Sequence, residues 1–225
     1  MPVISFASSK GGAGKTTSAI VLASELAEGT DVVLIDADPA RRLTRWSKLA
    51  PPPKRVHVVT SGGERAVQDE IAAARRRASF VLIDLEGAAS RLNSFAICES
   101  DLVIVPTGDE QQDADEAIET LAQIAMEGRA RRRDIAAAVL FTRTNAAVKS
   151  KLEKHINGEL RAAVRTFGTE LNRRTAFSSL HNAGGGLRQL NPADVSGIEK
   201  AITNAEAFTA EVVDMLEETR HAAIA

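Results

Sequence analysis

Short apolar runs rich in β-branched residues alternate along the chain with segments whose apolar residues recur at helical spacing. Runs such as Val32-Val33-Leu34-Ile35 and Val81-Leu82-Ile83 are apolar throughout, which is typical of strands covered on both faces. The alternation predicts an α/β fold, a doubly wound, mostly parallel sheet with helices on both faces. Strands are expected at 3–7, 31–35, 55–59, 79–83, 101–105 and 135–141, and helices at 16–28, 42–49, 64–77, 112–127, 147–162, 175–182 and 194–221.

Two connections and the last helix have distinctive compositions. Pro51-Pro52-Pro53 is expected to stiffen one connection, and Gly184-Gly185-Gly186 to make another flexible. The last helix should pack on the domain, because its apolar residues recur at helical spacing and its polar face is acidic. These apolar residues are Ile198, Ile202, Ala205, Phe208, Val212, Val213 and Leu216.

The length and composition suit one globular domain spanning 1–225, because 44% of the 225 residues are hydrophobic and 26% are charged. The single cysteine, Cys98, cannot form an internal disulfide, which favours a reducing compartment, and it is expected to pack on an apolar helical face. No apolar run approaches the roughly 20 residues of a membrane span. We therefore expect a cytoplasmic protein without a membrane partner.

Charge is distributed unevenly along the chain. Residues 127–181 carry 12 basic and 5 acidic side chains, a net charge of +7, whereas the whole chain has a net charge of −2. A basic segment in an acidic protein is a candidate surface for nucleic-acid phosphates. The alternative is a set of solvated helix faces.

A phosphate-binding loop is expected between the first strand and the first helix. The segment from Ser9 to Thr17 is rich in small residues, so its backbone N–H groups can curl around phosphate oxygens at a helix N-terminus. Lys15 would reach the β- and γ-phosphates of ATP, and the Thr16 hydroxyl would ligate Mg²⁺. The predicted nucleotide-binding residues are Lys10, Gly11, Gly12, Ala13, Gly14, Lys15, Thr16 and Thr17.

This loop resembles the deviant Walker A motif of the ParA/MinD ATPases, which has Lys10 as an additional lysine and does not require a glycine at Ser9. The resemblance covers the whole chain and implies that Lys10 crosses a homodimer interface to the partner's phosphates in the ATP state. Lys10, Lys15 and Asp38 are the catalytic residues that it implies. It continues through Asp36-Ala37-Asp38-Pro39, Val81-Leu82-Ile83-Asp84, Val103-Ile104-Val105-Pro106 and Arg174-Thr175-Ala176-Phe177.

Three aspartates lie where predicted strands end, which is the edge at which open parallel sheets bind ligands. By resemblance, Asp38 orients the attacking water, while Asp36 and Asp84 join Thr16 around Mg²⁺. The alternative is that Asp36 and Asp84 only cap strand ends. Glu86 follows them where the family more often has an uncharged residue, and its role stays open.

Branches of the ParA/MinD group differ in features that can be checked in this sequence. The nitrogenase iron protein uses two cysteines per subunit, MinD proteins have a basic amphipathic C-terminal helix, and large plasmid ParA proteins carry a helix-turn-helix before the phosphate loop; none is expected here. The chain resembles small ParA proteins, including the virulence-region relatives of T-DNA-transferring bacteria, through Thr44-Arg45-Trp46 and Asn172–Phe177. The cargo and the stimulating ParB-like adaptor stay undetermined.

Non-specific DNA binding is the second activity that the resemblance implies, and it would associate the protein with the nucleoid. Basic residues that contact phosphates bind DNA without reading its sequence, and one tryptophan with no tyrosine makes base stacking a poor alternative. The candidates are Arg173 and Arg174, followed by Arg161, Arg165, Lys149 and Lys151. Arg173 and Arg174 follow the phosphate loop by more than 150 residues, so their replacement is expected to leave ATP binding intact.

Two other functions remain as alternatives to a DNA-associated partition ATPase. A metabolic P-loop ligase of the dethiobiotin-synthetase type would need a small-molecule pocket, but neither Lys10 nor the basic segment. A MinD-like spatial regulator would need a membrane-binding helix, which the acidic last helix does not resemble.

Overall fold

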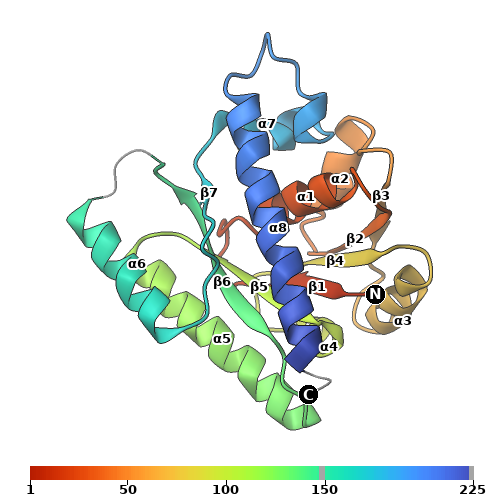
Figure 1. Ribbon diagram of the computed structural model, residues 1–225. Coiled ribbons are helices and arrows are strands. Elements are labelled where there is room, and N and C mark those ends of the chain that lie inside the picture. The colour runs from red at the N-terminus through yellow and green to blue at the C-terminus, as the bar shows by residue number, and fades with distance from the viewer. Residues whose placement is uncertain (147–149, 223–225) are drawn as a thin grey trace.

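A seven-stranded parallel sheet forms the centre of the protein (Figure 1). The computed structural model describes residues 1–146 and 150–222. The strand order is β3-β2-β4-β1-β5-β6-β7, so the six expected strands all form, and a short edge strand, β7, is added to them. The strands are β1 (Val3–Phe6), β2 (Val32–Ala37), β3 (Val56–Thr60), β4 (Phe80–Leu85), β5 (Leu102–Thr107), β6 (Ala137–Thr144) and β7 (Leu171–Asn172).

Helices connect the strands and cover the sheet. One of them, α4, was not among the expected helices, although the sequence placed Cys98 on a helical face. Another, α6, begins at Lys151 because Ser150 caps it, its Oγ accepting a hydrogen bond from the Glu153 backbone N–H at 3.1 Å. The helices are α1 (Lys15–Leu26), α2 (Arg42–Leu49), α3 (Val67–Arg75), α4 (Arg91–Glu99), α5 (Gln111–Arg131), α6 (Lys151–Ala163), α7 (Thr175–Ala183) and α8 (Ile198–Ala222), with a 3₁₀ turn, η1 (Leu187–Gln189).

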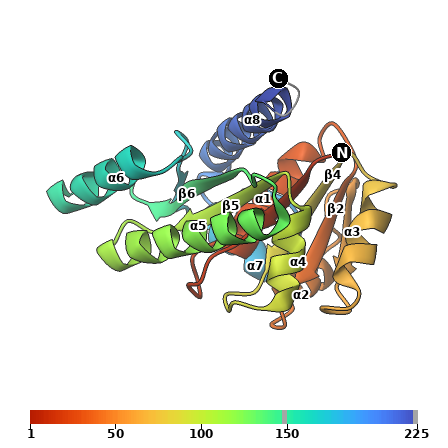
Figure 2. The ribbon, with the colours of Figure 1, turned by 90° about the horizontal axis from the view of Figure 1, so that it is seen from below.

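The sheet has an apolar core on each face, as the doubly wound prediction requires. Successive side chains of a strand point to opposite faces, so Ile4 and Phe6 of β1 enter one core, and Val3 and Ala7 enter the other. Helices α1, α2, α7 and α8 contribute to the first core, and α3, α4, α5 and α6 to the second. Figure 2 shows β5 and β6 lying between α8 and α5.

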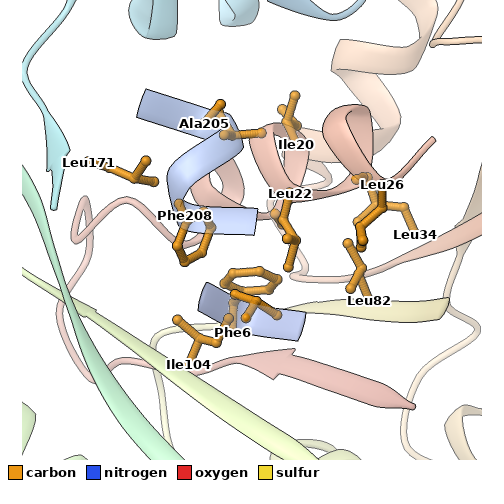
Figure 3. Packing of buried hydrophobic residues seen from close by; sticks show 14 of the residues in the cluster. Phe6, Ile20, Leu22, Leu26, Leu34, Leu82, Ile104, Leu171, Ala205 and Phe208 are labelled. Atoms are coloured by element: carbon orange, nitrogen blue, oxygen red, sulfur yellow. The ribbon is translucent and has the colours of Figure 1, made fainter. Parts of the chain in front are cut away.

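The last helix packs on the domain, as its apolar spacing predicts. Ala205 and Phe208 are fully buried, and Phe208 lies close to Phe6 and Leu22 (Figure 3). Its ring also meets Phe167 edge to face, with centroids 5.5 Å apart. Within residues 1–146 and 150–222, no helix is long and apolar enough to cross a membrane.

The segment Gly184–Gly186 is tightly packed, so the prediction of a flexible connection is wrong. All three glycines are buried, and Gly184 has a φ of 74°. A Cβ on Gly184 would lie 2.6 Å from the Ala50 backbone nitrogen, and the Trp46 indole N–H donates to the Gly185 carbonyl at 3.1 Å. The glycines therefore allow a close approach between the end of α7 and α2.

The strand order places one sheet edge in position to bind a ligand. β1 pairs with β4 on one side and with β5 on the other, so the winding of the sheet changes direction at β1. Open α/β sheets bind ligands in the crevice at the carboxyl ends of the strands beside such a point. The loop that follows β1 leads directly into α1 at this crevice.

Candidate nucleotide-binding site

The loop between β1 and α1 has the backbone that a phosphate cradle requires. Gly12 and Gly14 have φ values of 80° and 98°, which favour glycine. A Cβ on Gly14 would also lie 3.1 Å from the Thr142 hydroxyl oxygen, and that hydroxyl donates to the Ala13 carbonyl at 2.8 Å. Gly14 caps α1 without any side-chain hydrogen bond, so the helix N-terminus is suited to binding an anion.

Lys15 folds back over this loop. Its side chain is buried, and its ammonium donates to the main-chain carbonyls of Ser8 at 3.1 Å and Lys10 at 3.3 Å. Burial lowers the pKa of Lys15, while the nearby carboxylates of Asp84 and Asp38 raise it. The ammonium is therefore held at the centre of the loop by neutral carbonyl groups, where a phosphate would supply the missing negative charge.

Asp36, Asp84 and Thr16 meet in the fold as the resemblance implied. Asp36 and Asp84 are register partners on β2 and β4, both fully buried, and the Thr16 hydroxyl donates to Asp84 Oδ2 at 2.7 Å. Burial raises the pKa of Asp84 to about 7, the Thr16 hydrogen bond lowers it, and the charge of Asp36 raises it. Asp36 Oδ2 accepts hydrogen bonds from the backbone N–H and hydroxyl of Thr44, at 2.8 and 2.6 Å.

These residues fit a magnesium ion. The Oδ1 atoms of Asp36 and Asp84 are both buried without a hydrogen-bond partner, and the other Asp84 oxygen, Oδ2, accepts the Thr16 hydroxyl. Buried carboxylate oxygens without a partner are costly unless a cation or ordered water satisfies them. In the part of the chain that the structure describes, no cluster of three or more His, Cys, Asp or Glu could hold a metal. Mg²⁺ commonly binds through one or two carboxylates, water and substrate phosphates, so the small donor set suits it.

Asp38 lies at the same edge, but both of its carboxylate oxygens have partners. Oδ1 accepts a hydrogen bond from the Ala40 backbone N–H at 2.8 Å, and Oδ2 pairs with the Arg42 guanidinium at 2.6 Å. The intervening Arg41 has a φ of 52°, and its guanidinium donates at 2.8 Å to the carbonyls of Asp36 and Ser61. The loop after β2 is therefore held firmly to the sheet edge.

Lys10 is paired within its own chain. Its ammonium forms an ion pair with Asp113, a buried residue in the first turn of α5. The hydrogen bond to Asp113 is the largest cause that raises the pKa of Lys10. Gly108 leaves room for this carboxylate, because a Cβ there would lie 2.0 Å from Asp113 Oδ2. The trans role that the resemblance implies for Lys10 therefore requires this pair to open.

The segment after β4 lies against the phosphate loop. A Cβ on Gly87 would lie 3.4 Å from the Ser9 carbonyl oxygen and 3.6 Å from the Lys15 Nζ. The Asn93 side-chain amide donates to the carbonyls of Glu86 at 3.2 Å and Ala88 at 2.7 Å. The backbone of Glu86 is thus held by α4, and its side chain is half-buried beside the loop.

A cleft of about 380 Å³ lies beside the phosphate loop, and sequence reasoning did not identify most of its lining. Arg143 and His181 are among its residues, along with the apolar side chains of Leu171 and Phe177. His181 Nε2 is 2.7 Å from the Thr17 hydroxyl oxygen of the loop. Arg143 has a φ of 58° and lies in a register irregularity between Thr142 and Thr144. Such irregularities re-aim side chains near functional sites, and a sequence alone gives no sign of them.

Arg173 and Arg174 also line this cleft, close in space to the loop that precedes them by more than 150 residues. The Arg174 Nε is buried without a hydrogen-bond partner. Chain separation was the reason to expect that their replacement leaves ATP binding intact, and the structure removes that reason. Any test of DNA binding through these two arginines must therefore measure ATP affinity as well.

Two of the other DNA candidates are paired with acidic side chains. Arg161 donates to the Phe167 carbonyl at 2.6 Å and pairs with Glu170 at 3.0 Å. Arg165 pairs with Glu218 of α8 at 2.5 Å. Asn204, which lies 14 residues earlier on α8, accepts a hydrogen bond from the backbone N–H of Asn172, the residue before Arg173. That separation is about 21 Å along the helix. Lys151 is exposed at the start of α6, and Lys149 lies outside the described residues.

Comparisons with known proteins agree with this fold. The model of the VirC1 protein family matches residues 1–222. A ParA protein of Rhizobium radiobacter is 38% identical over 220 residues, which cover 97% of this chain and 99% of that protein.

Solved structures of partition and cell-division proteins have the same fold. A putative plasmid partition protein of Borrelia burgdorferi, bound to AMPPNP, superposes with a TM-score of 0.70 at 19% identity, covering 93% of this chain and 99% of that chain. The cell division ATPase MinD of Pyrococcus furiosus has a TM-score of 0.70 at 16% identity, covering 95% and 99%. The family match over almost the whole chain and the close ParA relative show that this chain belongs to the VirC1 family.

Proposed function

We propose that this chain is a Mg²⁺-dependent ATPase that dimerises in the ATP state, binds DNA without sequence preference and positions a cargo. The cargo is a plasmid, a chromosomal region or another assembly, and the whole of 1–225 acts as one ATPase domain. The observation that carries the proposal is the phosphate loop, with Lys15 folded over it and the Thr16 hydroxyl beside two buried carboxylates. The names of the ParA relative and of the AMPPNP-bound partition protein support it.

The phosphates of ATP would be held by the loop from Gly11 to Thr17. Its backbone N–H groups and the N-terminus of α1 bind the phosphate oxygens, and Lys15 contributes the positive charge. Asp36, Asp84 and the Thr16 hydroxyl would hold Mg²⁺, directly or through water. Bound there, the ion offsets the negative charge of the phosphates.

The adenosine part of ATP and the attacking water would be bound by residues around the phosphate loop. The cleft beside the loop, with apolar Leu171 and Phe177 in its lining, suits the adenosine part of ATP. Asp38 would orient the attacking water through a carboxylate oxygen, in competition with its present partners Ala40 and Arg42. Lys10 of a second copy would add a cation at the phosphates, as an arginine finger does, once it has left Asp113.

DNA binding would locate the protein on the nucleoid in the cytoplasm, with an adaptor of ParB-like role linking it to the cargo and stimulating slow hydrolysis. The net charge of +7 in residues 127–181 supports a phosphate-backbone surface, although its arginines are spread over the molecule. One monomer then neutralises few phosphates, and pairing two such surfaces in a dimer multiplies the affinity.

A mobility-shift experiment tests ATP and DNA binding together. The parent chain should shift two unrelated duplexes equally with ATP and Mg²⁺, weakly with ADP, and much less at moderate than at low salt. Lys15→Ala should lose the ATP-dependent shift, because the loop loses its principal cation. Lys200→Ala, an exposed lysine on α8, is the matched control and should behave like the parent.

The outcomes separate the parts of the proposal. An ATP-dependent shift that survives in Lys15→Ala would contradict the phosphate-loop assignment. ATP binding by calorimetry without any DNA shift would contradict the nucleoid role and favour the metabolic ligase. When the parent does shift DNA, Lys151→Glu, exposed at the start of α6, and Arg173→Glu, tested for ATP affinity in parallel, locate the DNA surface.

A further inference from the structure

Arg42 is a charged residue beside Asp38 that has no role in the proposed nucleotide site. It opens α2, a few residues after Asp36 at the end of β2 and Asp38 in the following loop. Its guanidinium Nη1 lies 2.6 Å from Asp38 Oδ2, and its side chain is 51% exposed, so it is free to rearrange. Each Asp38 oxygen already accepts one hydrogen bond, and the positive charge of Arg42 on Oδ2 weakens this carboxylate as an acceptor for water. Arg42 therefore competes with water for the group that hydrolysis needs.

Arg42 is also close to two other cationic or basic groups. Burial is the largest cause that lowers the pKa of Lys15 and the pKa of His181, and the charge of Arg42 lowers both pKa values further. Lys15 lies in the loop, and His181 is 2.7 Å from the loop residue Thr17. Groups that disfavour one another's charge are therefore gathered around the mouth of the phosphate loop. This arrangement becomes favourable when an anion is bound among them.

The backbone that carries Arg42 is held in place, whereas its side chain is not. Thr44 is bound to Asp36 through its N–H and hydroxyl, and Trp46 is fully buried with its N–H on the Gly185 carbonyl. Leu43, next to Arg42, is also fully buried. Rotation of the Arg42 side chain alone is therefore enough to move its guanidinium between neighbouring anions, without unfolding α2.

We propose that Arg42 contacts the terminal phosphate of ATP and in doing so releases Asp38. With ADP, which lacks that phosphate, the guanidinium stays on Asp38 and the carboxylate remains engaged. With ATP, the more highly charged phosphate competes for the guanidinium, and Asp38 Oδ2 becomes free to accept a hydrogen bond from water. Arg42 thus makes the catalytic readiness of Asp38 depend on the presence of a triphosphate. This inference rests on the proposed function.

Calorimetry with ADP and with a non-hydrolysable ATP analogue, each with Mg²⁺, tests the contact without relying on hydrolysis. The preference of the parent for the triphosphate over ADP should fall about tenfold in Arg42→Ala, because a charge-assisted hydrogen bond is lost while the Asp38 pair no longer has to open. Affinity for ADP should stay within about twofold. Arg42→Lys should recover part of the preference, since an ammonium keeps the charge but not the planar fork. Arg45→Ala, exposed on the same helix, should match the parent.

Each alternative result has a separate meaning. An unchanged preference in Arg42→Ala, with normal binding by the parent, overturns the Arg42 contact and leaves the proposed function intact. Equal losses for ADP and the analogue also overturn it, because they show that Arg42 only supports the site as a whole. If the parent binds neither nucleotide, the proposed function itself fails. Should Arg42→Ala fail to fold, the comparison of Arg42→Lys with the parent decides the same question.

Discussion

At the scale of single residues, two buried carboxylates destabilise the folded protein, and a bound cation would relieve this destabilisation. Asp36 and Asp84 lie side by side in a fully buried position, each with one oxygen that lacks a hydrogen-bond partner. A structural pair of this kind would be expected to have complete hydrogen bonding. Such destabilisation is expected at a binding site, because residues arranged to bind a ligand are often unfavourable for the stability of the unliganded protein.

The pH dependence of stability should reveal this destabilisation at Asp84. Its pKa in the folded protein is about 7, raised by burial above the ordinary 3.8, so the native state holds the proton more tightly than the unfolded state. The resulting stabilisation is complete below about pH 4 and is lost as the pH rises to about 7. Without Mg²⁺ and nucleotide, the parent should lose about 2–3 kcal/mol relative to Asp84→Asn between pH 5 and pH 7.5.

Denaturant unfolding at the two pH values measures this difference. Asp134→Asn, an exposed carboxylate, is the control and should follow the parent. Parallel pH profiles for the parent and Asp84→Asn would show that Asp84 is already ionised at pH 5, contrary to its raised pKa.

At the scale of elements, α2 and α7 are coupled through a glycine segment. Trp46 of α2 reaches the Gly185 carbonyl, and α7 carries His181 to the phosphate loop. The loop that holds Asp38 and the wall of the cleft are therefore parts of one packed unit. A change at either end is transmitted through contacts that tolerate little displacement.

Gly184→Ala should destabilise the protein by about 3 kcal/mol, because a Cβ there adds a clash with α2 to the cost of a left-handed backbone. Gly197→Ala is the matched control, since Gly197 has nearly the same φ, 72° against 74°, and nothing within 4 Å of its Cβ position. It should cost only about 1 kcal/mol. Chemical denaturation of the two variants gives the comparison, and equal losses would mean that the close approach to Ala50 carries no energetic weight.

At the scale of the whole molecule, the proposed ATP-state dimer would compete with an ion pair inside the monomer. Lys10 is bound to Asp113 of its own chain, across 103 positions of sequence. For Lys10 to reach the phosphates of a second copy, the buried Asp113 must give up its partner, and a buried charge left alone is costly. The pair would therefore raise the protein concentration needed for the proposed dimer to form.

Asp113→Asn should lower that concentration. In an Asp38→Ala background, which is expected to prevent hydrolysis, sedimentation should show monomer with ADP and dimer with ATP. The Asn variant should dimerise at about tenfold lower protein concentration. Asp115→Asn, exposed on the same helix, serves as the control. Equal masses with ADP and ATP in every variant would count against the dimer. Dimerisation that is unaffected by Asp113→Asn would contradict only the opposing effect of the Lys10–Asp113 pair.

The sequence by itself determined the features whose physics is local. Strands β1 to β6 follow from apolar runs, the loop after β1 from small residues before a helix, and the position of Asp36 and Asp84 at the ligand-binding edge from their places at strand ends. The magnesium role of these two aspartates was implied by the resemblance alone. Each of the local features depends on neighbouring residues and on the two-sided burial of a parallel sheet. For the same reason the spacing of apolar residues was enough to predict that α8 packs on the domain.

Only the tertiary structure decided which distant side chains meet. It placed Arg173 and Arg174 against the phosphate loop and paired Lys10 with Asp113. It also made Gly184–Gly186 a tight contact, although glycine-rich segments are more often flexible. Such contacts depend on how closely packed elements approach one another. Composition and the spacing of residues along the chain do not predict the distance between elements that are far apart in the sequence.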